Sequence, residues 1–329
     1  MHYEYIFYIK KEKMSNKQPQ VYFYVPYADV LQVREDEEKY TYANGIVSRR
    51  KFLKSPLNYI GGKYKLLPQL IEFFPEKINT FVDLFSGGFN VGINVDCNKV
   101  ICNDMNTFII DLYKELYSKP IDETLNKITG RINEYGLSKE NEEAFKKFRD
   151  YYNKTKEPID LYTLSCYSFN YQFRFNNNKE YNNPFGRNRS QFSDNMKSNL
   201  ILFTEKLKSM NVEFLSEPFD KVDLSKLNNE DFVYCDPPYL ITTGSYNDGR
   251  GFKDWKEEEE IQLYKVLDEL NKRKVKFALS NVIEHKGKEN ILLKEWSKKY
   301  KTIYLTSDYS NSSYNTKRDK SIEVLIINY

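Results

Sequence analysis

Cysteine and histidine are both scarce in this chain. Its 329 residues include four cysteines, none of them in a C-x-x-C pair, and two histidines. This spacing does not match the common zinc sites or the disulfide frameworks of small secreted proteins. We therefore expect no bound metal, and thiols that are reduced and mostly buried.

Long apolar runs and a strong charge of one sign are also absent. No apolar stretch reaches 18 residues, the chain shows no signal-peptide pattern, and the net charge is only +3. These features argue against a membrane span and a secreted protein. We expect a soluble, cytoplasmic α/β protein whose length allows a full core.

The most informative motif is Asp-Pro-Pro-Tyr at Asp236, Pro237, Pro238 and Tyr239, directly after the apolar run 232–235. Strand-forming residues followed by an acid and two prolines predict a buried strand and then a rigid loop. Proline fixes φ and lacks the N–H that a β-ladder needs, so the strand cannot continue. Ligands bind at that end of strands in open α/β sheets. A simple strand terminator is the alternative for this motif taken alone.

Such a loop suits methylation of an exocyclic amine on a nucleobase. Asp236 and the Pro237 carbonyl can each accept an N–H of the amine, and both interactions strengthen as positive charge develops on nitrogen. Tyr239 offers a face on which a flipped base can stack.

Two further strands are predicted to end in acids. The stretch 80–92 indicates a strand ending at Asp83, a glycine turn through Phe85, Gly87 and Gly88, and a helix that begins near Asn90. The stretch 100–106 indicates a second strand, followed by Asp104. Asp83 is placed to meet a cationic group, and Asp104 is placed to meet ribose hydroxyls. A dinucleotide-binding domain is the main competitor, but G-x-G-x-x-G is absent.

The middle of the chain has a different composition. Residues 161–200 hold nine aromatic residues, nine asparagines, five Lys/Arg and two acids. The alternation over 169–176, the turn at 177–179 and the return over 181–189 predict a hairpin-like loop that carries amides, aromatic rings and arginines suited to DNA. An asparagine-rich surface loop is the alternative.

Farther on, Asp254–Glu257 predicts a capping box at the start of a helix that extends to about Arg273. The run of glutamates at 257–260 is explained by the helix dipole, which favours negative charge at a helix N-terminus.

In this order, the motifs resemble the Dam family (D12 class, alpha group) of DNA adenine N6-methyltransferases. The resemblance spans residues 55–329 and implies a Rossmann-like, class I S-adenosylmethionine-dependent methyltransferase sheet with an inserted target-recognition segment. It implies catalytic residues at 236–239 and double-stranded DNA as the partner. The implied cofactor residues are Tyr59, Gly61, Gly62, Lys63, Asp83, Phe85, Gly87, Gly88, Asp104 and Asp236.

The same resemblance implies that DNA is contacted from the hairpin. In it, Arg174 stands where the family reads a guanine, although Tyr171, Gln172 and Asn188 depart from the Dam pattern. GATC is the target that the resemblance suggests. The implied DNA-binding residues are Phe169, Asn170, Gln172, Arg174, Asn176, Pro184, Arg187 and Arg189.

The expected domains are an N-terminal extension of unknown role (1–54, with a strand at 21–25), a catalytic domain (55–160 and 212–329) and a target-recognition segment (161–211). The expected activity is site-specific adenine methylation in a restriction-modification or host-marking role, which would make a restriction endonuclease encoded nearby a further partner. Methylation of RNA, and DNA binding without catalysis, remain the alternatives.

Overall fold

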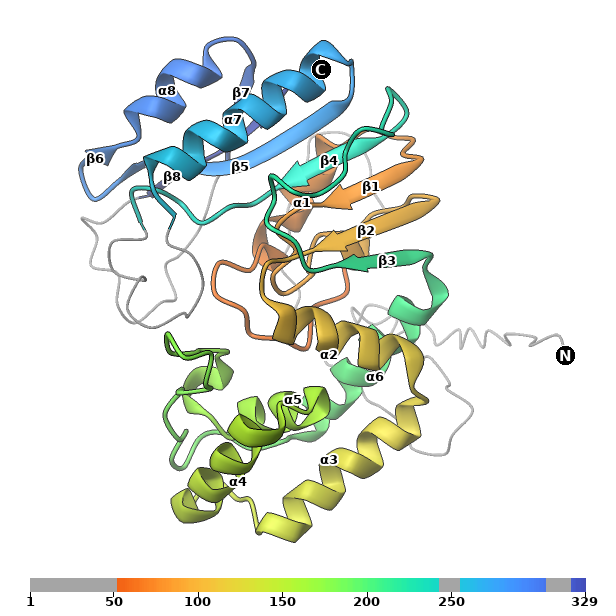
Figure 1. Ribbon diagram of the computed structural model, residues 1–329, viewed down its shortest axis with the longest axis vertical. Helices are drawn as coiled ribbons and strands as arrows, with labels where there is room; N and C mark the ends of the chain where they lie inside the picture. The colour runs from red at the N-terminus through yellow and green to blue at the C-terminus, as the bar shows by residue number, and fades with distance from the viewer. Residues whose placement is uncertain (1–51, 243–254, 306–320) are drawn as a thin grey trace, which may run out of the picture. The chain divides into compact units, whose positions relative to one another are not determined.

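A mostly parallel sheet forms the centre of the structure, in the order β3-β2-β1-β4-β5-β8-β7, with β6 paired to β5 (Figure 1). The strands β3, β2, β1, β4 and β5 run parallel, whereas β8 is antiparallel to both β5 and β7. The strands are β1 (Thr80–Asp83), β2 (Lys99–Asn103), β3 (Val212–Leu215), β4 (Phe232–Cys235), β5 (Lys276–His285), β6 (Lys288–Glu289), β7 (Lys301–Leu305) and β8 (Ser321–Ile327).

The computed structural model describes residues 52–242, 255–305 and 321–329. All of them belong to one unit, Lys51–Tyr329. The predicted strand at 21–25 and nearly all of the predicted N-terminal extension lie outside these residues. Within these ranges, no helix combines the length and the apolar character needed to cross a membrane.

Helices cover both faces of the sheet. One core is built from α1, α2 and α6 together with α3 to α5, and a second core contains the apolar sides of α7 and α8. Because both faces are covered, the central strands are mostly apolar, and every residue of β4 is buried. The helices are α1 (Leu67–Glu72), α2 (Thr107–Ser118), α3 (Ile121–Tyr135), α4 (Glu142–Thr155), α5 (Pro158–Cys166), α6 (Asp194–Ser209), α7 (Glu257–Lys272) and α8 (Ile291–Ser297).

The chain between β2 and β3 forms a helical layer beyond α2 (Figure 1). Helix α5 lies within this layer, and each of its residues from Ile159 to Cys166 is buried. The fully buried Asp160 accepts a hydrogen bond from Arg131 Nε on α3 at 3.0 Å, which offsets part of the cost of burying its charge. The predicted boundary at 160/161 falls inside α5, and the domain division stays a prediction.

Two local predictions were wrong. The segment after the glycine turn is the single 3₁₀ turn Gly92–Asn94 rather than a longer helix, since the chain is extended again at Val95. The N-cap of α7 is Lys256, whose N–H donates to the Glu259 carboxylate at 3.0 Å. The predicted cap, Asp254, lies outside the described residues.

Candidate functional site

Three acids lie at one edge of the sheet because three parallel strands end there. Asp83 closes β1, Asp104 follows β2, and Asp236 follows β4. Asp83 is in register with Cys102 and Tyr234, and each of these lies two residues before the acid that follows its own strand. The predicted strand ends at these three acids are therefore confirmed, and the parallel strands bring the acids to one edge.

Lys63 joins the predicted cofactor segment to the predicted catalytic loop. Its ammonium lies 2.7 Å from Asp236 Oδ2 and donates to the Gly61 carbonyl at 2.7 Å. The side chains of Lys63 and Asp236 are 6% and 16% exposed, so this ion pair is far better shielded from solvent than a surface pair. The ammonium also lies 5.1 Å from the centre of the Tyr239 ring.

The Asp236 carboxylate has a second partner in its own loop. The Tyr239 hydroxyl donates to Asp236 Oδ1 at 2.8 Å. Pro237 is buried between them, while Pro238 and Tyr239 are partly exposed. Burial raises the pKa of the Tyr239 phenol, and the neighbouring Asp236 adds to this rise. The hydroxyl therefore stays protonated and acts as a donor.

Asp83 is a buried carboxyl group that lacks a full set of partners. It is 1% exposed, and its Oδ2 accepts the Gly92 N–H at 3.1 Å. No partner for its Oδ1 is found in the described part of the chain. The pKa of this group is raised from 3.8 to about 8, chiefly because burial disfavours the charged form, and Asp236 and Asp104 add to the rise.

Asp104 organises the glycine turn. Its two oxygens accept the N–H groups of Gly87 and Asn106, each at 2.8 Å. Gly87 has a φ of +45°, and a Cβ there would lie 2.9 Å from the Tyr59 ring. A side chain at residue 87 would thus be strained and would displace Tyr59. Gly88 belongs to the same turn, and Gly61 and Gly62 lead into Lys63.

An aromatic cluster, Phe85–Phe219–Trp255, lies at the same edge. The ring centres of Phe85 are 5.5 Å from Phe219 and 5.6 Å from Trp255, and Phe219 is 5.5 Å from Trp255. Sequence analysis selected Phe85 but missed the other two. Their position shortly after a strand end and at the start of a helix is the only signal that could have indicated them.

The predicted hairpin is present, with short bridges in place of long strands. Phe175 pairs with Tyr181, and the Asn182 N–H donates to the Arg174 carbonyl at 3.0 Å. Tyr181 is buried, and its hydroxyl donates to the Gln172 carbonyl at 2.8 Å, which fixes the hairpin from within. The alternation predicted from Phe169 is broken at its start by the 3₁₀ turn Phe169–Tyr171.

Most predicted DNA-binding side chains are accessible. Phe169 is 43% exposed, and Gln172 and Asn176 are half-buried. Asn176 serves the turn, since its Oδ1 accepts the N–H groups of Asn178 and Glu180. The remaining predicted residues are all exposed: Asn170, Arg174, Pro184, Arg187 and Arg189. Their role in binding DNA stays a prediction.

Two contacts hold the predicted DNA-binding loop in place. Arg187 forms an ion pair with Glu142 on α4. Asn58 donates to the Asn170 carbonyl at 2.6 Å and forms a parallel bridge with Gln172. Asn58 directly precedes Tyr59, so the hairpin is tied to the segment that carries Lys63. Sequence analysis missed Asn58, because a single asparagine carries no sign of a contact so distant in sequence.

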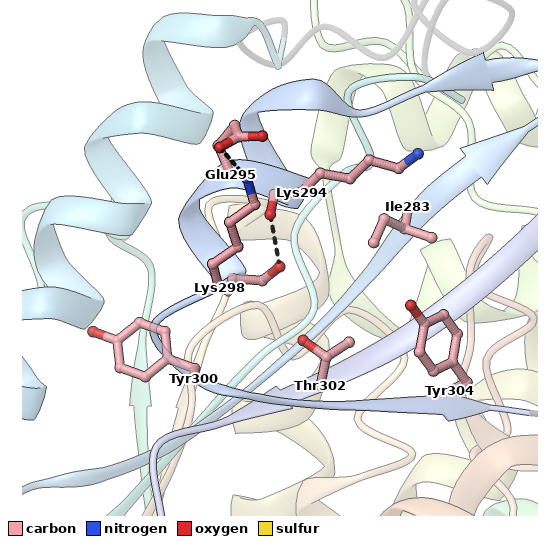
Figure 2. A pocket seen from close by; sticks show the side chains of 8 residues that line it. Ile283, Lys294, Glu295, Lys298, Tyr300, Thr302 and Tyr304 are labelled. Atoms are coloured by element: carbon pink, nitrogen blue, oxygen red, sulfur yellow. Dashed lines mark hydrogen bonds and ion pairs between the residues drawn. The ribbon is translucent and has the colours of Figure 1, made fainter.

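The predicted catalytic and cofactor residues line neither of two open hollows in the described structure. A hollow of about 430 Å³ lies over β5, β7 and α8, and Figure 2 shows Lys294, Tyr300 and Tyr304 among its lining side chains. A second, of about 400 Å³, lies between α4 and the hairpin, and of the predicted site residues it includes Asn176. In the described ranges, no group of three or more His, Cys, Asp and Glu side chains is arranged to hold a metal ion.

Comparison with known proteins gives consistent results. The family model for D12 class N6 adenine-specific DNA methyltransferases matches residues 59–311. Type II methyltransferase M.FokI of Planomicrobium okeanokoites is 62% identical over 279 residues, which is 84% of this chain and 43% of that protein. Modification methylase StsI of Streptococcus sanguinis is 55% identical over 287 residues, or 86% of this chain and 44% of that protein.

A shorter relative matches over nearly its whole length. DNA adenine methylase of Escherichia coli K12 is 28% identical over 285 residues, which cover 84% of this chain and 95% of that protein. By contrast, the chain spans less than half the length of the first two relatives. The family match covers the Asp236 loop, Lys63 and the acids of β1 and β2, and by it the chain belongs to the D12 class of N6 adenine-specific DNA methyltransferases.

Proposed function

We propose that this chain transfers a methyl group from S-adenosylmethionine to N6 of an adenine flipped out of duplex DNA. The observation that carries the proposal is the Lys63–Asp236 ion pair at 2.7 Å. It places the segment 59–63, which holds predicted cofactor residues, beside the Asp-Pro-Pro-Tyr loop. Family membership supports the reaction type and the adenine target.

The residues at the sheet edge fit S-adenosylmethionine. The buried Oδ1 of Asp83 has no partner in the described structure and suits the ammonium of the methionine part. Each oxygen of Asp104 accepts one backbone N–H, and its remaining lone pairs suit ribose hydroxyls. Phe85, two residues after Asp83, offers an apolar aromatic face. When bound, the cofactor supplies an electrophilic methyl group.

The catalytic loop orients the target amine. Asp236 and the Pro237 carbonyl each accept one N–H of the adenine amine, which draws the nitrogen lone pair out of conjugation and toward the methyl group. Both acceptors become more favourable as the nitrogen gains positive charge, so they stabilise the transition state more than the ground state. The Tyr239 ring stacks on the flipped base. Lys63 holds Asp236 in place through its second oxygen.

The hairpin supplies site recognition in this proposal. Arg174 is exposed on the hairpin and can contact a guanine through a bidentate pair, the commonest specific contact in the major groove. GATC is the first target to test, and mapping of methylated adenines would reveal any other short site directly. The names of two relatives, a type II methyltransferase and a modification methylase, support a restriction-modification role.

The test is transfer of tritium from labelled S-adenosylmethionine into unmethylated duplex DNA, followed by sequencing of the modified adenines. We expect wild-type protein to label one short motif and Asp236→Ala to lose the activity. Asp223→Ala, which removes an exposed acid from the segment before β4, is the matched control and should retain activity. Cofactor binding without methyl transfer to DNA would contradict duplex DNA as the substrate. Transfer to single-stranded RNA would favour an RNA methyltransferase.

The restriction-modification role has its own test. Genomic DNA from cells that express the chain should resist cleavage at the mapped motif by an endonuclease sensitive to N6-methyladenine. Complete cleavage, with the protein present and active in the tritium assay, would contradict a protective role.

A further inference from the structure

Glu260 is a buried carboxylate that the proposed reaction does not use. It lies in the first turns of α7 and is 0% exposed. Four uncharged donors contact it: Trp255 Nε1 at 2.6 Å, the Tyr264 hydroxyl at 2.7 Å, Asn281 Nδ2 at 3.0 Å and Asn290 Nδ2 at 3.1 Å. The helix dipole, which explains the neighbouring glutamates, does not explain an inward side chain with four partners.

The network has one consistent arrangement. The Asn281 Oδ1 accepts the Val282 N–H at 2.7 Å, and the Asn290 Oδ1 accepts the Leu293 N–H at 3.0 Å. Both amide nitrogens must therefore point toward Glu260, so its carboxylate is surrounded by donors. An ionised carboxylate, which only accepts hydrogen bonds, satisfies this arrangement completely.

The two oxygens of Glu260 have different tasks. Oε1 takes all three contacts from Tyr264, Asn281 and Asn290, which join α7, β5 and the start of α8. Oε2 takes the indole N–H of Trp255, the one side-chain donor to it among the described residues. Oε1 thus links α7, β5 and the start of α8, and Oε2 fixes the orientation of the Trp255 ring.

That ring belongs to the aromatic cluster Phe85–Phe219–Trp255. Trp255 meets Phe85 edge-on, with an interplanar angle of 80°, and is 7% exposed. Phe85 directly follows β1 and precedes the glycine turn, so a rotation of Trp255 would remove the support behind the residue that faces the cofactor. We propose that Glu260 is a positioning residue for cofactor binding, which acts by holding the Trp255 indole against Phe85. This inference rests on the proposed use of S-adenosylmethionine.

The chain contains a matched control for this contact. Trp296 Nε1 donates to Asp268 Oδ1 at 2.9 Å, and Asp268 lies on α7 as Glu260 does. Trp296, however, stacks on Tyr264 at 4.3 Å and has no contact with Phe85 among the described ring pairs. Trp255→Phe and Trp296→Phe therefore each remove one indole donor from a carboxylate on the same helix, and only the first lies next to the cofactor edge.

The experiment measures the dissociation constant of S-adenosylmethionine by calorimetry for wild type and both Trp→Phe variants. We expect Trp255→Phe to weaken binding about tenfold, because no hydrogen bond then fixes the ring that supports Phe85, and Trp296→Phe to leave it within twofold. In steady-state assays of Trp255→Phe, KM for the cofactor should rise by a larger factor than kcat falls. Thermal unfolding of both variants shows whether they are comparably folded.

A second measurement tests Glu260 itself. The chain has two tryptophans, so in a Trp296→Phe background the emission reports Trp255 alone. Adding Glu260→Gln places an amide N–H opposite the indole N–H, and we expect the Trp255 emission to change and cofactor affinity to fall as in Trp255→Phe. Equal affinities of Trp255→Phe and Trp296→Phe for S-adenosylmethionine would overturn this inference and leave the proposed function standing. Wild-type protein that fails to bind S-adenosylmethionine would overturn both the proposed function and this inference.

Discussion

Asp83→Asn should stabilise the protein, and the gain should grow with pH. The Asp83 carboxyl has its pKa raised from 3.8 to about 8, chiefly by burial. The native state therefore binds this proton more tightly than the unfolded chain. The stabilising contribution is complete below pH 3.8, decreases as the pH rises, and is fully lost above about pH 8.

The magnitude follows from the size of the shift. A rise of about four pKa units corresponds to about 6 kcal/mol between the two ends of this range, at 1.36 kcal/mol per unit. Between pH 5 and pH 7, the difference in unfolding free energy between Asp83→Asn and wild type should therefore rise by roughly 1.4 kcal/mol per pH unit. Asparagine is nearly isosteric and uncharged, so the variant should lack this pH dependence.

The assay is urea unfolding followed by circular dichroism at pH 5, 6, 7, 8 and 9. Asp231→Asn is the comparison, because Asp231 is also buried but accepts hydrogen bonds from Asn79, Thr80 and Asn228, and its loss should destabilise the protein. Parallel pH profiles for wild type and Asp83→Asn would refute the assignment of a raised pKa to Asp83. The same variant should also bind S-adenosylmethionine more weakly, because asparagine cannot supply a negative charge to the ammonium.

Three further substitutions test the catalytic pair, the hairpin and site recognition. Lys63→Met leaves Asp236 without its cation in a shielded site, so we expect kcat for methyl transfer to fall about 10- to 100-fold while the secondary structure seen by circular dichroism is kept. Gly186→Ala would place a Cβ 2.0 Å from the Ser190 hydroxyl oxygen, and thermal unfolding should show a loss of about 1–3 kcal/mol. Arg174→Ala should reduce the discrimination between the mapped site and single-base variants by about 1–3 kcal/mol, measured by fluorescence anisotropy at fixed salt.

The parts of the fold that local patterns determine were predictable. Strand β4 coincides with the predicted run 232–235, because a short apolar stretch that ends in Asp-Pro-Pro leaves few alternatives. Strands β1 and β2 were placed the same way, and their acids fell at one edge because parallel strands share a direction. The hairpin turn at 177–179 was evident from its asparagines, which favour turns.

The parts that depend on tertiary contacts were not predictable. Nothing in the run 257–260 distinguishes Glu260 from its neighbours, yet it points inward because Trp255, Asn281 and Asn290 place donors around it. The helix expected near Asn90 ends after the turn Gly92–Asn94, where the Asn94 side chain exchanges hydrogen bonds with the Leu53 backbone. Such outcomes depend on partners far apart in sequence, which periodicity does not encode.

The charge balance at the sheet edge connects these observations to the cofactor. Asp83, Asp104 and Asp236 lie at neighbouring strand ends, and Lys63 is the cation that the described structure places in contact with one of them. An edge with more acids than cations raises the pKa of its most buried member, as seen for Asp83. S-Adenosylmethionine carries a sulfonium and an ammonium, so its binding would offset this repulsion. The same surplus of negative charge that destabilises the free protein at high pH therefore favours a cationic methyl donor.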